Sequence, residues 1–155
     1  MKQFTDSQGR AWALAITLGA AQKVRAALDV DLLNPAALSD DGAPVMQRLL
    51  YDDVFLCLVV AEMIKDQLER ASVSQDEFLN ALDGEAIGRL DEAFWAEYRF
   101  FFLARGKEWV VKAIEIDLET RKTNERKALE SLSESLNGTT SATLQAAPES
   151  TTSEN

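Results

Sequence analysis

Apolar side chains alternate with small or polar ones near the start of the chain. Trp12, Leu14 and Ile16 recur at every second residue, separated by alanines. A period of two is typical of a strand that buries one of its faces. This segment is therefore predicted to form a half-buried β-strand.

A second short strand is predicted over residues 2–5, ahead of a turn. Residues 6–9 (DSQG) supply turn chemistry, and Gly9 is able to adopt a positive φ. The pattern predicts a β-hairpin over residues 1–18, with Phe4 opposite the strand that carries Trp12. Because a lone two-stranded hairpin is marginal in water, it must pack on helices or pair with another subunit.

From Gly19 onward the apolar spacing changes to three and four residues, which is typical of helices. A helical core is predicted over residues 19–105. Its expected helices begin near residues 19, 44, 52, 75 and 85, and a loop is expected over 29–43, where Asn-Pro and Asp-Asp-Gly occur.

Two of these helix starts have local signals. Asp52 and Asp53 are suited to cap a long helix that continues to about Arg70. Ser74 and Glu77 form a capping-box pattern, followed by an apolar face at residues 78, 79 and 82. These signals predict where the helices begin.

The densest apolar segment is 94–103 (FWAEYRFFFL). A core-facing stripe is expected at Ile87, Leu90, Phe94 and Phe101, three, four and seven residues apart. That choice leaves several aromatic side chains on a second face of the helix.

Trp95 and Phe102 lie seven residues apart on this second face, with Arg99 between them. One interpretation is that another helix of the same domain covers them. The other is an exposed aromatic face for a partner, since Trp, Phe and Arg anchor many interfaces. The candidate partner-binding residues are Trp95, Arg99, Phe102 and, early in the next helix, Trp109.

A break is expected at Arg105-Gly106, followed by a last helix over residues 106–135 whose second half is charged and projects. The Ser/Thr/Ala-rich segment 136–155 is interpreted as a disordered tail. The predicted fold class is mainly α: an N-terminal β-hairpin, then a bundle of about five helices with the last one projecting.

The net charge of −10 over 155 residues argues against nucleic acid as a partner, since no cluster of Lys and Arg is visible. The acid is concentrated at residues 31–100, with 15 Asp and Glu against 5 Lys and Arg. This region is either a solvated acidic surface or a face that steers a basic partner.

Catalytic chemistry has little support in the sequence. Histidine is absent, which removes the commonest general base and most zinc sites. The carboxylate pairs 52/53, 76/77 and 91/92 are more simply explained as helix N-termini or solvated faces. We predict no catalytic residues, no cofactor and no metal, and a protein that is not an enzyme.

Cys57 is the only cysteine, so no internal disulfide forms, and its apolar neighbours predict that it packs as a small hydrophobe. The longest apolar run, 54–61, is too short to span a bilayer, and the N-terminus has no signal-peptide pattern. We therefore expect no membrane contact and a cytoplasmic location.

Three segments, 4–12 (FTDSQGRAW), 23–33 (KVRAALDVDLL) and 73–78 (VSQDEF), resemble small proteins encoded in phage and prophage tail clusters. That group is similar to tail assembly chaperones. The resemblance implies a small, acidic, helical protein that coats the long tape measure protein and keeps it soluble until the tail tube assembles.

The expected function is therefore a tail assembly chaperone that binds the tape measure protein, in the host cytoplasm if the gene is phage-borne. The alternative is a structural subunit of the virion, such as a tail completion or head–tail connector protein. Assembly into a homo-oligomer is left open by the sequence.

Overall fold

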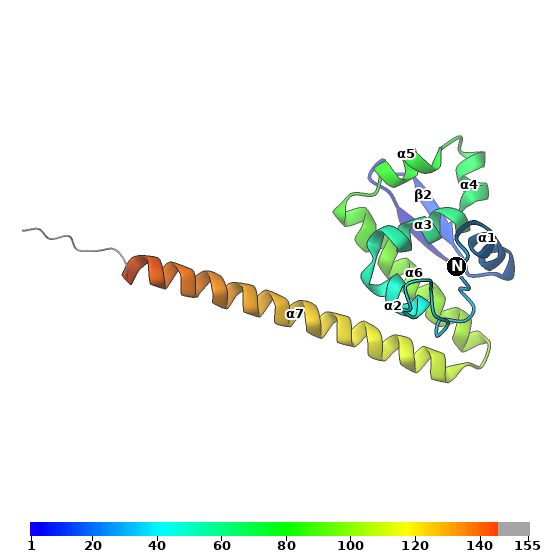
Figure 1. Ribbon diagram of the computed structural model, residues 1–155. Coiled ribbons are helices and arrows are strands. Elements are labelled where there is room, and N and C mark those ends of the chain that lie inside the picture. The colour runs from blue at the N-terminus through cyan, green and yellow to red at the C-terminus, as the bar shows by residue number, and fades with distance from the viewer. Residues whose placement is uncertain (146–155) are drawn as a thin grey trace, which may run out of the picture. The chain divides into compact units, whose positions relative to one another are not determined.

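The computed structural model describes residues 1–145, with side chains as far as residue 138. It confirms the predicted fold class: an N-terminal antiparallel hairpin is followed by seven helices in this range (Figure 1). The elements are β1 (Lys2–Thr5), β2 (Ala11–Leu14), α1 (Leu18–Leu28), α2 (Val45–Tyr51), α3 (Asp53–Met63), α4 (Lys65–Arg70), α5 (Gln75–Asn80), α6 (Gly84–Ala104) and α7 (Glu108–Gln145).

The hairpin forms with Phe4 opposite the second strand, as predicted, and its register places Phe4 directly across from Trp12. Its turn is organised by the buried carboxylate of Asp6, which accepts hydrogen bonds from the backbone N–H of Gln8 (2.9 Å) and of Arg10 (3.0 Å). Arg10 Nε (2.8 Å) and Trp12 Nε1 (3.0 Å) donate to its second oxygen. Gly9 adopts φ +79°, as the turn requires.

The electrostatics of Asp6 reflect two opposing effects. Burial by itself raises the pKa of this carboxyl, but the hydrogen bonds from Trp12, Arg10 and Gln8 outweigh it and hold the pKa below its ordinary value. Asp6 is therefore ionised at neutral pH, and its charge stabilises the turn.

Helix α3 forms the centre of the unit Met1–Glu115 (Figure 1). Leu56, Val59 and Val60 are fully enclosed, whereas Val54 in the first turn of α3 is exposed. The hairpin packs its aromatic face on α5, where the ring of Phe78 meets those of Phe4 and Trp12 edge-on at 6.3 and 5.8 Å. One continuous core therefore connects the hairpin to the helices.

The long helix predicted from Asp52 to Arg70 is divided in two. Asp52 caps α3 as expected, accepting a hydrogen bond from the N–H of Phe55 at 3.0 Å. The helix is interrupted at Ile64, where φ is −101° and ψ is 15°. After this change of direction the amide of Gln67 bonds to the backbone of β2. The contact between Gln67 and β2 thus accompanies an interruption of the helix that no glycine or proline in the sequence predicts.

The first compact unit extends to Glu115, beyond the predicted end of the helical core at residue 105. Residues 108–115 of α7 belong to this unit, and residues from 116 onward form the second.

The prediction that helix ends at residue 135 is wrong for 136–145, because α7 continues to Gln145. Extending an existing helix costs far less than nucleating one, and no proline occurs between residues 45 and 147 to stop it. The remainder of the predicted disordered tail, 146–155, lies outside the described residues.

Within the described residues, no helix combines the length and the apolar character that a membrane span requires.

Candidate partner-binding surface

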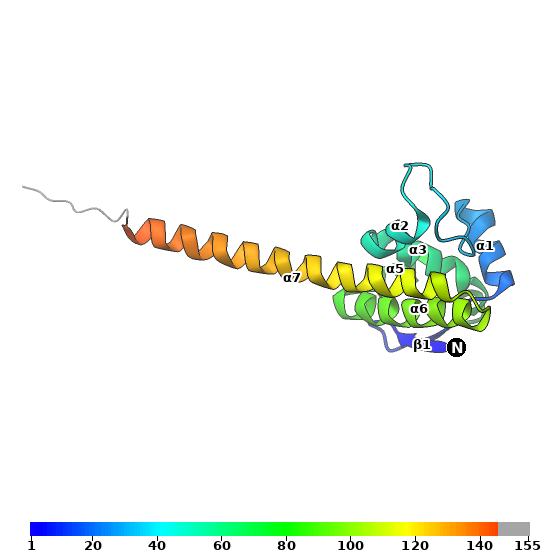
Figure 2. The ribbon, with the colours of Figure 1, turned by 90° about the horizontal axis from the view of Figure 1, so that it is seen from below.

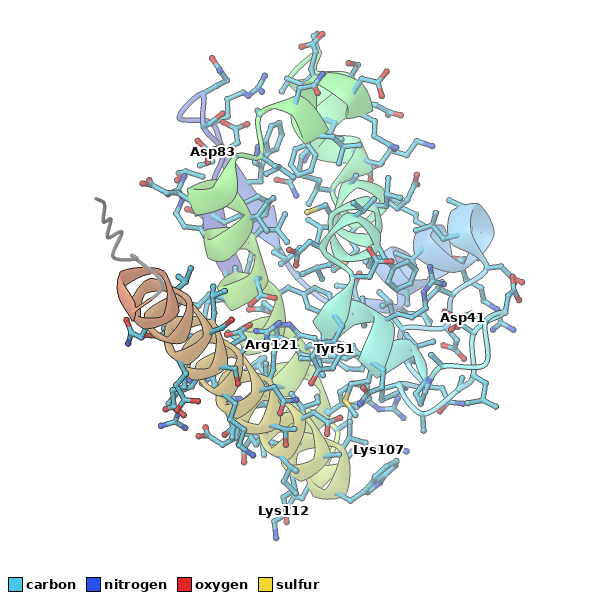
Figure 3. All side chains as sticks on the ribbon, turned by 60° about the vertical axis from the view of Figure 1, so that its left-hand side comes forward. Asp41, Tyr51, Asp83, Lys107, Lys112 and Arg121 are labelled. Atoms are coloured by element: carbon cyan, nitrogen blue, oxygen red, sulfur yellow. The ribbon has the colours of Figure 1, made fainter. Side chains whose placement is uncertain are left out.

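Helix α6 positions all but one of the predicted partner-binding residues. Asp83 caps its first turn, with the N–H of Ala86 donating to its side chain at 2.9 Å. At the other end Gly106 takes φ +70°, and the N–H of Lys107 donates to the carbonyl of Phe102 at 2.9 Å. Asp83 and Lys107, labelled in Figure 3, mark the two ends of α6. The predicted break before the last helix is confirmed.

The inner side of α6 is a row of side chains four residues apart: Leu90, Phe94, Tyr98 and Phe102, all fully buried. Neighbouring rings in this row lie 5.1 Å apart, from Phe94 to Tyr98 and from Tyr98 to Phe102. The Tyr98 hydroxyl donates a 2.6 Å hydrogen bond to the carbonyl of Leu32, and burial raises the pKa of this phenol. These aromatic residues therefore belong to the core.

The prediction of an exposed aromatic face is wrong for Trp95 and Phe102, which are only 3% and 1% exposed. Phe102 continues the buried row, whereas Phe101, the residue expected there, is only partly buried. Trp95 borders the same row, and its indole N–H donates to Asp91 at 3.2 Å. Neither side chain is available to a partner in this conformation.

The exposed apolar residues of α6 are Phe100 and Leu103, with 62% and 55% of their surface accessible. They border a groove of about 620 Å³, whose wall continues onto α7 at Val111 and Glu115. Arg99 is half exposed at this groove, and its guanidinium lies 3.7 Å from the carboxylate of Glu115. We call this site the outer groove.

One carboxylate that lines the outer groove is buried and paired. Glu97 lines it with a side chain that is only 7% exposed, and the α-amino group of Met1 lies 2.8 Å from its carboxylate. Figure 2 shows the first turns of α7 beside α6, which brings the walls of the groove together. The site is thus an apolar hollow with charged groups around it.

Trp109 is exposed over 63% of its surface, which the partner-binding prediction requires. It does not line the outer groove. Of the four predicted residues, the groove thus includes only Arg99. The contributions of Phe100 and Leu103 were missed, although their spacing with Ala96 marks a second row along the helix.

The second unit also presents apolar side chains. Leu129, Leu132 and Leu136 are exposed and recur at three and four residues, so they share one face of α7. A face of this kind is suited to packing on another helix.

Cys57 is buried, as predicted, and lines a small apolar hollow of about 180 Å³ with Val54 and Leu79. Burial, followed by the nearby charges of Asp53 and Asp91, raises the pKa of its thiol to about 11. The thiol therefore stays protonated at neutral pH and is a poor nucleophile.

Among residues 1–145, no group of three or more Cys, Asp or Glu side chains is placed to hold a metal ion. Comparison of the chain with protein-family models, with curated proteins and with solved structures found no match.

Proposed function

We propose that this chain is a binding protein that holds an apolar segment of another polypeptide in the outer groove. The observation that carries the proposal is the exposure of Phe100 and Leu103 at the rim of the groove, on a helix that buries most of its other aromatic side chains. Exposed apolar side chains that border a groove with charged neighbours are characteristic of protein-docking sites.

The charge of the unit Met1–Glu115 supports a basic partner. This unit contains 12 Lys and Arg against 19 Asp and Glu, a net charge of −7. A surface with this excess accelerates encounter with a positively charged polypeptide and disfavours an acidic one. The apolar groove would supply affinity, and the net negative charge of the whole unit would supply steering.

The particular function that we propose is that of a tail assembly chaperone, with the tape measure protein as client. The resemblance of segments 4–12, 23–33 and 73–78 to proteins of phage tail clusters supports this choice. A long helical client exposes apolar side chains at regular intervals along its length. The apolar side chains of one helical turn would fit a short groove such as the outer groove. The exposed leucines at 129, 132 and 136 offer the same client a second contact.

Co-expression with the tape measure protein tests the proposal. The double variant Phe100→Asp/Leu103→Asp should lower the soluble fraction of the client roughly tenfold, because two charges replace the apolar rim. Leu18→Asp is the matched control, since Leu18 is 73% exposed but lies on α1. Thermal unfolding of each variant establishes that it is folded.

Equal client solubility with the double variant and the control would overturn the site. Purified phage particles provide a separate test of the function, because a chaperone leaves before assembly is complete. Retention of the chain in stoichiometric amounts would instead favour a structural subunit of the virion.

A further inference from the structure

The two outer edges of the β-hairpin are treated differently by the rest of the chain. On β2, the side chain of Gln67 occupies the edge at Ala13: the N–H of Ala13 donates to Gln67 Oε1 at 2.9 Å, and Gln67 Nε2 donates to the carbonyl of Ala13 at 2.7 Å. This amide takes the place that a neighbouring strand would fill. The edge of β2 is closed at its centre.

The same contact establishes which backbone groups of β1 point outward. Ala13 faces Gln3 across the hairpin and directs its backbone groups away from β1, so Gln3 and Ala13 are a non-hydrogen-bonded pair. The bond from the N–H of Asp6 to the carbonyl of Arg10, at 3.0 Å, fixes the same alternation. The N–H and C=O of Gln3 and of Thr5 therefore project from the free edge of β1.

Only one of these four groups has a partner within residues 1–145. Arg89 Nε donates to the carbonyl of Thr5 at 3.1 Å. In the part of the chain that the structure describes, the N–H and C=O of Gln3 and the N–H of Thr5 have no hydrogen-bond partner, and both residues are exposed. An exposed strand edge with unpaired groups is a template for pairing with another chain.

A hollow of about 450 Å³ lies along this edge, between β1 and α6. Arg89, Glu92, Ala93 and Ala96 form its helical wall, and the two alanines leave space beside the strand. Figure 2 shows β1 running alongside α6. This hollow shares Lys2 and Ala96 with the outer groove, so the two sites adjoin.

We infer that the free edge of β1 binds an extended segment of the client as a third strand. Gln3 would bond through both backbone groups and Thr5 through its N–H, while alternate client side chains face Ala93 and Ala96. Those positions suit medium-sized apolar side chains. The inference rests on the proposed function and adds an extended segment to the client that the outer groove binds.

The charge of the unit selects a basic client over a second copy of the chain. Two copies, each with a net charge of −7 on this unit, repel one another as they approach, whereas a basic segment is attracted to the unit. The charged residues along the edge itself are Lys2, Arg89 and Glu92. Glu92, exposed on the helical wall, is placed to pair with Lys or Arg of the bound strand.

The test uses the full chain and an acetylated, amidated octapeptide of alternating valine and lysine. NMR-detected amide exchange should slow roughly tenfold at Gln3 and Thr5 on saturation with peptide, while exchange at Ala13 stays unchanged. A peptide of the same sequence, N-methylated at alternate residues, keeps the side chains but loses the backbone donors. It should bind at least about tenfold more weakly.

Gln3→Pro removes the outward N–H, and Gln3→Ala is its matched control. Because this N–H is not used within the hairpin, proline is tolerated there in an edge strand. Peptide affinity should fall roughly tenfold with Gln3→Pro and stay within about twofold with Gln3→Ala. If Gln3→Pro fails to fold, the exchange experiment on the unmodified chain decides.

Failure to bind the peptide, or unchanged exchange at Gln3 and Thr5 on saturation, would overturn the inference. Protection of these amides that grows with the concentration of the chain alone would overturn it in favour of a second copy. Neither result affects the proposed function, which depends on client solubility in the Phe100→Asp/Leu103→Asp variant. Loss of client solubility there, with no strand addition, would leave the groove as the binding site.

Discussion

The two sides of α6 carry similar side chains in different surroundings. On the inner side Tyr98 and Phe102 are fully buried against the rest of the unit. On the outer side Phe100 and Leu103 keep more than half of their surface exposed. The comparison teaches that aromatic content alone does not locate an interface, since the same residue types serve as core and as surface within two turns.

The largest expected effect on stability is at Phe102, on the inner side of α6. Phe102→Ala should lower the free energy of unfolding by about 3–5 kcal/mol, because it empties a fully buried site beside the rings of Tyr98 and Phe101. Chemical denaturation followed by circular dichroism measures it. A loss under about 1 kcal/mol would contradict the assignment of Phe102 to the core.

Asp6 should give the next largest effect, through the hairpin that packs beside α6. Asp6→Asn should cost about 2 kcal/mol at pH 7, because charge-assisted hydrogen bonds from Arg10 and Trp12 are lost or weakened. Denaturation of the variant and the unmodified chain at pH 7 gives the difference.

The pH dependence of this difference has a definite sign. The folded-state pKa of Asp6 lies below the ordinary value of 3.8, so its stabilisation is present above that pH and is lost as pH falls through the folded pKa. The gap between Asp6→Asn and the unmodified chain should therefore close below about pH 4. A gap that is constant between pH 2 and 7 would contradict an ionised Asp6 in the fold.

Tyr98→Phe probes the inner side with a smaller change. Removing the hydroxyl breaks the hydrogen bond to the carbonyl of Leu32 and leaves that buried acceptor unpaired, at a cost of about 1–2 kcal/mol. Ring packing against Phe94 and Phe102 is retained. A variant as stable as the unmodified chain in denaturant titration would mean that water replaces the lost donor.

The smallest effect is expected on the outer side. Phe100→Ser and Leu103→Ser should each change the free energy of unfolding by less than about 0.5 kcal/mol, since both side chains are largely in solvent. Binding of an apolar dye to the folded chain should decrease at the same time. A destabilisation above about 2 kcal/mol would place these residues in the core and remove the contrast between the two sides.

Local sequence signals predicted a large part of the fold. The alternation at Trp12 and Leu14, with turn residues before it, predicted the hairpin and placed Phe4 opposite its second strand. Ser74 accepts a hydrogen bond from the N–H of Glu77 at 3.0 Å, as the capping pattern indicated. Turn and capping patterns predict local structure well because the residues that interact lie within a few positions of one another in the sequence.

The candidate site was less predictable, because eight of the ten residues in the segment 94–103 are apolar or aromatic. A helical period identifies the buried face of a helix only when polar residues occupy the opposite face. Here the two polar residues of the segment, Glu97 and Arg99, do not both lie on the exposed face. Arg99 is at the surface, whereas Glu97 is buried. Which row enters the core is decided by tertiary packing.

The interruption of the helix at Ile64 also could not be predicted from neighbouring residues. The sequence between Asp53 and Arg70 contains no glycine or proline that would break a continuous helix. The change of direction is coupled to the bonds between Gln67 and Ala13, two residues 54 positions apart in the chain. Pairings at that separation are not encoded in a helical period.

Photo-crosslinking in the presence of the tape measure protein tests the central claim most directly. The photoreactive residue p-benzoylphenylalanine would replace Phe100 in one variant and Leu18, on α1, in the other. Both positions are exposed, but only Phe100 borders the outer groove. We predict a crosslinked adduct with the client from position 100 and none from position 18. Equal crosslinking at both positions, or none at position 100 while the client remains soluble, would contradict the account.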